Sequence, residues 1–355
     1  MITLEKTWQK YLSNNKVIPY NSYNNVESIE NMPTQELLVK NLKISFTTPE
    51  KELVAVRGIS YQLNQGETLA LVGESGCGKT VSALSILKLI QEPPGKILSG
   101  EIIFDGKDLL KLTKKELQDR RGRDIAMIFQ DPMTSLNPVL TIGEQIIETV
   151  LRHTTLSRKE AREKSFNLLE QVEIPSPKQK LDQYPHQLSG GMRQRAMIAI
   201  ALSCSPRVLI ADEPTTALDV LIQAQILELL KQVKKDNLMS ILLITHDLGV
   251  VAEIAERVMV MYAGEIVESG PVRELFRTPL HPYTIGLMKS IPTLDSAKQK
   301  ISKLNEISGT VPSLSQIPSG CPFHPRCPSA ETRCRTDKPS LKETAHEHAV
   351  SCWLH

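Results

Sequence analysis

Residues 73–80 read Gly-Glu-Ser-Gly-Cys-Gly-Lys-Thr, so four residues separate the first glycine from the Gly-Lys-Thr end. The apolar run 69–72 precedes them, and a helical pattern over residues 81–90 follows. This spacing between a strand and a helix is typical of a phosphate-binding P-loop. Backbone N–H groups of such a loop surround an anion, and the helix N-terminus adds its dipole. The sequence therefore predicts a nucleotide site in an α/β fold.

The P-loop also supplies side chains for the phosphates and their cation. Lys79 can reach the β- and γ-phosphates, and the Thr80 hydroxyl can bind Mg²⁺. The residues expected to contact the nucleotide here are Gly73, Glu74, Ser75, Gly76, Cys77, Gly78, Lys79, Thr80 and Val81.

An acidic pair ends a second apolar run, at residues 208–211. Asp212 would hold Mg²⁺, and Glu213 would orient or deprotonate the attacking water. Taken alone, the pair is a solvated turn before a proline, but beside a P-loop the catalytic interpretation is favoured. His246 follows the apolar run 241–244 and could donate a hydrogen bond to a γ-phosphate, and Gln130 could bind Mg²⁺. Taken alone, His246 is better explained as a residue that caps a helix or fills a corner, and Gln130 could also be a plain loop glutamine.

The rest of the chain alternates strand and helix patterns, which favours an α/β core with a largely parallel sheet. Leu42, Ile44 and Phe46 alternate with polar residues, and 208–210 and 241–244 are continuous apolar runs. Residues 220–235 place apolar side chains mostly on one helical stripe. The composition changes near residue 270, which predicts a domain boundary within 271–282. We expect a flexible extension over 1–36, an ATP-binding domain over 37–270 and a C-terminal domain over 271–355.

Charge and composition exclude several classes of partner. The 42 basic side chains nearly balance the 40 acidic ones, and aromatic residues make up only 4%, so a nucleic-acid partner is not expected. Apolar runs fall short of the roughly 18 residues that cross a bilayer, and the N-terminus lacks the pattern of a secretory signal. We therefore expect a cytoplasmic chain that serves a membrane only through other subunits.

The segment 188–195, Leu-Ser-Gly-Gly-Met-Arg-Gln-Arg, resembles the signature of ABC-type ATPases, with Met192 where that family usually has glutamine. Residues 37–270 resemble the family's complete motif set in its usual order. The elements of that set are the P-loop, Gln130, the signature, Asp212 with Glu213, the segment Ala217, Leu218 and Asp219, and His246.

Three further segments are similar to the ATP-binding subunits of bacterial dipeptide and oligopeptide importers. They are Phe-Gln-Asp-Pro-Met-Thr-Ser-Leu-Asn-Pro at 129–138, His-Pro-Tyr-Thr at 281–284 and Cys-Pro-Phe-His-Pro-Arg-Cys at 321–327. The resemblance implies a P-loop NTPase fold of the ABC type, with a mixed sheet, a helical subdomain at about 131–185 and a small cysteine-containing C-terminal extension of regulatory type. It implies an ATPase of the translocase class that powers peptide import. Nickel, metallophores or glycosides are alternative solutes, and a soluble non-transport ABC ATPase is a further alternative.

The resemblance also implies a site shared between two chains packed head to tail. Each ATP would lie between the P-loop of one chain and the signature of the other, where Ser189, Gly190 and Gly191 bind the γ-phosphate and Asp219 lies nearby. Phe46 would stack on adenine, unless it is an ordinary strand residue. Lys79, Gln130, Glu213 and His246 are the implied catalytic residues.

The implied partners are a second ATPase subunit, expected to be a sister chain, two transmembrane permeases and an extracytoplasmic solute-binding protein. The implied location is the cytoplasmic face of the inner or plasma membrane, as a peripheral subunit.

Four of the six cysteines, Cys321, Cys327, Cys334 and Cys352, lie in the last 35 residues, with five, six and seventeen residues between them. These spacings match neither common zinc ribbons nor the compact ferredoxin run. We favour a [4Fe–4S] cluster, which some members of the resembled subfamily carry. Zinc is the rival, with His324, His346 or His348 as a substitute ligand, and free thiols are the third interpretation.

Overall fold

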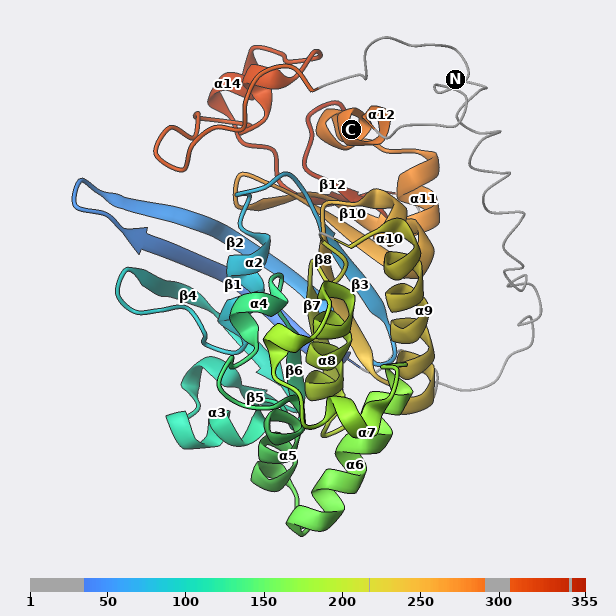
Figure 1. Ribbon diagram of the computed structural model, residues 1–355. Helices are drawn as coiled ribbons and strands as arrows, with labels where there is room; N and C mark the ends of the chain where they lie inside the picture. Colours follow the sequence, from blue (N-terminus) through green and yellow to red (C-terminus); the bar gives the residue numbers. More distant parts are fainter. Residues whose placement is uncertain (1–34, 217, 291–306, 345–346) are drawn as a thin grey trace, which may run out of the picture.

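The computed structural model describes residues 35–216, 218–290, 307–344 and 347–355. Its centre is an eight-stranded sheet in the order β11-β12-β10-β9-β3-β8-β7-β6 (Figure 1). The neighbours β9, β3, β8, β7 and β6 are parallel, whereas β10, β11 and β12 add antiparallel pairs. The strands are β3 (Thr68–Val72), β6 (Ile125–Ile128), β7 (Val208–Asp212), β8 (Ser240–Thr245), β9 (Arg257–Tyr262), β10 (Glu265–Pro271), β11 (Lys342–Glu343) and β12 (Ala349–Val350).

The middle strands are buried on both faces, as their continuous apolar runs predict. Every residue of β3, β7 and β8 is buried. In β3, Ala70 and Val72 pack in the apolar cluster to which the helices α5 (Ile142–His153), α8 (Gly190–Leu202) and α9 (Val220–Asn237) contribute. Leu69 and Leu71 pack in the cluster of the second sheet. The ends of these strands therefore have little freedom, and the loops that follow them start from fixed positions.

The second sheet is antiparallel, with the order β2-β1-β4-β5. The predicted alternation in β1 is confirmed for Leu42, Lys43 and Ile44, which are buried, exposed and buried in turn. It breaks down at Ser45, which is also fully buried and follows a shift in the pairing register after Ile44. In Figure 1 the blue strands β1 and β2 extend away from the helical layer. The strands are β1 (Gln35–Thr47), β2 (Glu52–Asn64), β4 (Gly95–Phe104) and β5 (Lys107–Asp108).

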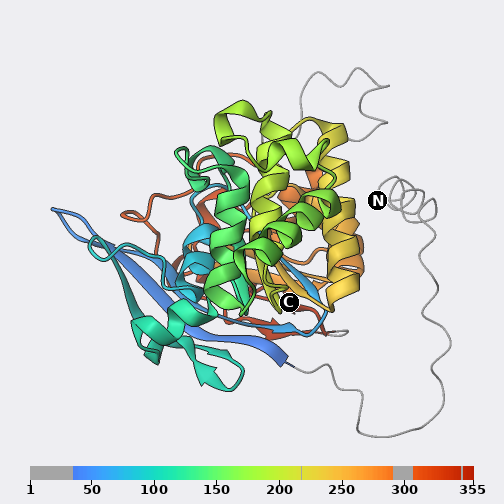
Figure 2. The same cartoon turned by 60° about the horizontal axis from the view of Figure 1, so that its bottom comes forward.

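Helices cover the face of the large sheet that lies opposite the second sheet (Figure 2). The helices that lie between β6 and α8 in the sequence form a group of their own. In this group, α5 and α6 each begin with a capping box, built by Thr141 with Glu144 and by Ser157 with Glu160. The group occupies the residues for which a helical subdomain is predicted. The helices are α2 (Lys79–Ile86), α3 (Lys114–Arg120), α4 (Pro132–Ser135), α5 (Ile142–His153), α6 (Arg158–Gln171), α7 (Pro177–Lys180), α8 (Gly190–Leu202), α9 (Val220–Asn237), α10 (Leu248–Ile254), α11 (Val272–Arg277), α12 (Pro282–Lys289) and α14 (Arg333–Thr336), with 3-10 turns η2 (Leu109–Lys111), η3 (Pro185–Gln187) and η4 (His324–Arg326).

The helix predicted over 81–90 was wrong at its C-terminal end, because α2 stops at Ile86. Lys88 adopts the left-handed conformation with φ of 46°, which ends the helical hydrogen-bonding pattern. The helix predicted over 220–235 continues to Asn237, and Leu238 then turns left-handed with φ of 50°.

The C-terminal part of the chain packs on the same core as the ATP-binding part. Tyr283 and Phe323 belong to the apolar cluster of the parallel sheet, and β12 pairs with β10. The fully buried Glu268 accepts hydrogen bonds from the N–H groups of Leu280 and His281, and His348 Nε2 lies 2.7 Å from its carboxylate. A shared core therefore spans the stretch 271–282, and the domain boundary predicted there stays a prediction. Most of the extension predicted over 1–36 lies outside the described residues.

Within the described parts of the chain, no helix combines the length and the apolar character needed to cross a bilayer.

Candidate nucleotide-binding and hydrolysis site

The predicted P-loop connects β3 to α2, and Lys79 is tied into it. Lys79 Nζ donates to the carbonyl oxygens of Gly73 at 2.8 Å and Glu74 at 3.0 Å, and the residue is only 6% exposed. Gly78 has a left-handed φ of 106°, and a Cβ there would stand 2.8 Å from the Ala55 carbonyl oxygen. The sequence thus folds into a tight loop with a buried ammonium group, because only glycine fits at residue 78.

The loop residues differ in what they can offer a nucleotide. Ser75 and Gly76 are exposed at the tip, and Val81 is half-buried on α2. Cys77 is fully buried within the apolar cluster of the second sheet, so its backbone, and not its thiol, is the part available to a ligand.

Asp212 ends β7 beside Thr80, as the sequence predicts. The Thr80 hydroxyl donates to Asp212 Oδ1 at 3.1 Å, and Asp212 is 1% exposed. Burial raises the pKa of Asp212 to about 6, a rise that the Thr80 hydrogen bond opposes and the charge of Glu213 supports. A buried carboxylate of this kind gains from a neighbouring cation, and carboxylate and hydroxyl oxygens are ligands that Mg²⁺ prefers. These two residues therefore fit a magnesium site.

Three side chains converge on the Glu213 carboxylate. Gln130 Nε2 and the Thr216 hydroxyl each donate to Oε2 at 2.8 Å, and His246 Nδ1 lies 3.1 Å from Oε1. Burial acts to raise the pKa of Glu213, but the hydrogen bonds from Thr216, His246 and Gln130 outweigh it and the pKa is lowered. Glu213 also has a left-handed φ of 48°, a backbone strain that is common at functional sites.

The structure thus brings the predicted residues together in two linked groups: Thr80 with Asp212, and Glu213 with Gln130 and His246. The predicted contact of Gln130 with Mg²⁺ stays a prediction, since its amide is bonded to Glu213 here. Thr216 was missed by sequence reasoning. The one feature of the sequence that could have indicated it is its position three residues after Glu213, from which a hydroxyl group can reach back to the carboxylate.

The predicted signature lies at the start of α8. Ser189 is the N-cap of that helix and accepts a hydrogen bond from Met192 N at 3.4 Å. Ser189 and Gly190 are exposed, and Gly191 and Met192 are half-buried. Among the described residues, no hydrogen bond or ion pair joins Ser189, Gly190 or Gly191 to the P-loop of the same chain. The N-terminal end of α8, for which anion binding stays a prediction, is thus exposed to solvent.

The remaining predicted site residues have local structural roles. Asp219 caps α9 by accepting from Ile222 N at 2.9 Å, while its predicted neighbour Ala217 lies outside the described residues. Phe46 lies on β1, 3.2 Å from where a Cβ on Gly95 would stand. Gln194 of α8 donates to the carbonyl oxygen of Pro214 at 2.6 Å, which connects the signature helix to the segment after Glu213.

Comparison with known proteins identifies the family of the chain. Residues 56–216 match the ABC transporter family, and residues 267–334 match the oligopeptide/dipeptide transporter C-terminal region. The oligopeptide transport ATP-binding protein AppD of Bacillus subtilis (strain 168) is 53% identical over 90% of this chain and 96% of its own length. The chain belongs to the ABC transporter family.

Other similarities support the same assignment. The dipeptide transport ATP-binding protein DppD of Bacillus subtilis (strain 168) is 52% identical over 90% of this chain and 94% of its own length. A dimeric structure of the ATP-binding cassette MJ0796, in a post-hydrolysis state bound to ADP and Pi, is 28% identical with a TM-score of 0.61, covering 67% of this chain and 99% of that one. The ABC fold is thereby established, and this ABC ATPase hydrolyses ATP.

The four C-terminal cysteines line one small cavity together with His324 and His281. Burial raises the pKa of Cys321 to about 11, and the nearby thiols of Cys334, Cys352 and Cys327 add to the rise. In the described ranges, no group of three or more His, Cys, Asp or Glu side chains is placed to hold a metal ion. His348, one of the histidines considered for zinc, is paired with Glu268, and His346 lies outside the described residues. The comparisons and the structure do not establish a metal in this extension.

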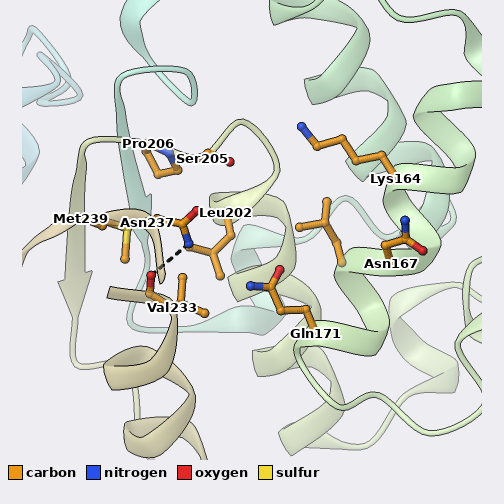
Figure 3. A pocket seen from close by; sticks show the side chains of 10 residues that line it. Lys164, Asn167, Gln171, Leu202, Ser205, Pro206, Val233, Asn237 and Met239 are labelled. Atoms are coloured by element: carbon orange, nitrogen blue, oxygen red, sulfur yellow. Dashed lines mark hydrogen bonds between the residues drawn. The ribbon is translucent and has the colours of Figure 1, made fainter. Parts of the chain in front are cut away.

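A separate cavity of about 190 Å³ lies between α6 and α9 (Figure 3). Lys164, Asn167 and Gln171 line it from α6, and Val233 and Asn237 line it from α9. None of the predicted site residues lines it, so the nucleotide site and this cavity are distinct.

Proposed function

We propose that this ABC ATPase powers the import of dipeptides or oligopeptides through a membrane transporter. The supporting observation is its identity of 52–53% to relatives named as oligopeptide and dipeptide transport ATP-binding proteins, over nearly their full lengths. The match of residues 267–334 to the C-terminal region of such transporters supports the same solute class.

The site residues take the following roles in this proposal. Lys79 and the P-loop N–H groups bind the phosphates of ATP, and Phe46 stacks on the adenine. Thr80, Asp212 and Gln130 hold Mg²⁺, which supplies positive charge to the β- and γ-phosphates when bound. Glu213 orients the attacking water and accepts its proton, and His246 donates a hydrogen bond to the transferring phosphoryl group.

We further propose that each site is completed by a second ATPase subunit. The exposed Ser189 and Gly190 would bind the γ-phosphate of the partner's ATP, near the partner-facing Asp219. Val220 and Leu221, which follow Asp219, are 86% and 69% exposed, as expected for apolar residues that a partner covers. A sister chain is the expected partner, beside two permeases and an extracytoplasmic solute-binding protein, at the cytoplasmic face of the membrane. Nucleic acid has no place in this assembly.

The solute is tested by assembling the chain with its permeases and its solute-binding protein in vesicles. ATP hydrolysis is expected to rise several-fold when the binding protein carries a peptide, because only the loaded protein closes the ATPase pair. Nickel, a metallophore or a glycoside in place of the peptide is expected to leave the basal rate unchanged. Stimulation by one of these solutes and not by peptides would overturn the proposal.

We also propose that Cys321, Cys327, Cys334 and Cys352 bind a [4Fe–4S] cluster. The supporting observation is that all four side chains line the same cavity, and four cysteine sulfurs are the usual ligand set of such a cluster. Zinc is the alternative metal, since four cysteine sulfurs are also a common zinc ligand set. The cluster would have a structural role, holding together the C-terminal segment from residue 321 to residue 352.

Metal analysis of the full chain, purified without oxygen, is expected to give iron and acid-labile sulfide near four per chain. Cys334→Ser is expected to lose most of both, whereas Cys204→Ser, which changes a cysteine outside this cavity, is expected to keep them. One zinc ion per chain without sulfide would show that the cysteines bind zinc and not a cluster. A chain without iron, sulfide or zinc would show that they are free thiols.

A further inference from the structure

The side chain of the P-loop residue Glu74 is held by the C-terminal part of the chain. Arg326 Nη1 donates to Glu74 Oε2 at 2.8 Å, and Nη2 donates to Oε1 at 3.1 Å. The pair is therefore bidentate, the strongest geometry for a guanidinium and a carboxylate. Only 7% of the Arg326 side chain and 25% of the Glu74 side chain are exposed, so water screens the pair weakly.

The backbone of Glu74 is held from the same direction. Its N–H donates to the hydroxyl oxygen of Tyr283 at 2.9 Å, and Tyr283 is fully buried. Both the main chain and the side chain of this P-loop residue thus depend on residues that lie more than 200 positions later in the sequence.

Arg326 is itself fixed in place. Its guanidinium lies 5.9 Å from the ring centroids of both Tyr262 and Phe323. It also donates to the carbonyl oxygens of Ser308 at 3.1 Å and Ile307 at 3.3 Å. Because the aromatic rings belong to the buried core, the guanidinium has little freedom to follow Glu74 if the loop moves.

We propose that Arg326 and Tyr283 are positioning residues for ATP binding, which act through Glu74. A carboxylate in a loop that receives a triphosphate repels the ligand unless a cation neutralises it. Arg326 supplies that cation, and together with Tyr283 it holds the loop in the form in which Lys79 and the N–H groups face the phosphates. This inference rests on the proposed role of the P-loop, and it does not depend on which solute is transported.

The test compares nucleotide affinity in full-length variants, with a fluorescent ATP analogue as the probe. Arg326→Gln leaves the Glu74 carboxylate without its partner and is expected to weaken binding about tenfold, with a matching rise in KM for ATP and little change in kcat. The double variant Arg326→Gln with Glu74→Gln is expected to bind severalfold more tightly than Arg326→Gln alone, because no unpaired carboxylate remains. Arg335→Gln, an exposed arginine of the same segment, is the matched control and should bind normally.

A purely structural role for Arg326 predicts a different pattern. In that case Arg326→Gln would lower kcat and the thermal unfolding temperature, and Glu74→Gln would not restore affinity. Either normal ATP binding by Arg326→Gln or failure of the double variant to recover affinity would overturn the proposal.

If Arg326→Gln does not fold, Tyr283→Phe provides the test, since it removes only the acceptor for the Glu74 N–H and is expected to weaken ATP binding. Normal ATP binding by a Lys79→Met variant would instead contradict the role of the P-loop itself.

Discussion

Glu213→Gln is expected to lower ATP turnover by about 10²- to 10⁴-fold while ATP binding persists. The glutamine has nearly the same shape, and its amide oxygen can still accept hydrogen bonds from Gln130 and Thr216. It cannot accept a proton from water, so the step in which the nucleophile forms becomes slow. Because ATP then remains bound between two chains, pairing should also become stable.

Two measurements check this result. Steady-state phosphate release gives the loss of turnover, and size-exclusion chromatography with and without ATP shows whether pairs accumulate. Glu228→Gln is a suitable control, because Glu228 is an exposed carboxylate on α9 whose Oε2 lies 3.5 Å from Lys231 Nζ. Unchanged hydrolysis by Glu213→Gln would show that another group activates the water.

The parts of the site that could be predicted from the sequence are those that short segments determine by themselves. Glycine spacing, a buried strand and an acidic pair at a strand end are local, and parallel strands bring their carboxyl ends to one edge of the sheet. Asp212 and Thr80 therefore meet although 132 positions separate them. The same reasoning explains why Glu213 and His246 are adjacent, since each follows one of the neighbouring strands β7 and β8.

Contacts made by irregular segments could not be predicted in this way. Arg326 lies in a 3-10 turn of a proline-rich segment, and no periodicity indicates that it reaches Glu74, 252 positions earlier. The short strand β12 is similarly too brief to be recognised, although its pairing with β10 places the C-terminal part on the shared core. The early end of α2 depends on a left-handed residue, Lys88, that the apolar pattern does not reveal.

The second large effect is expected from Lys79→Met, which should weaken ATP binding by roughly 100-fold or more. Lys79 is buried and its ammonium group donates to two loop carbonyls, so its position within the P-loop is fixed before any ligand arrives. Methionine fills a similar space but offers neither charge nor donors. The loss of a buried, hydrogen-bonded charge contact costs about 3 kcal/mol, which corresponds to roughly two orders of magnitude in affinity.

Thermal unfolding measures this loss without relying on hydrolysis. ATP with Mg²⁺ stabilises the folded chain in proportion to the logarithm of ligand concentration over Kd, so the unfolding temperature of the original chain should rise with added ATP. Lys79→Met should show almost no rise, whereas Lys96→Met, an exposed lysine on β4, should behave like the original chain. An equal rise in both variants would mean that the triphosphate is not held by the P-loop ammonium group. Since Glu213→Gln keeps ATP binding in the same assay, the two variants together separate the residues that bind the nucleotide from those that break it.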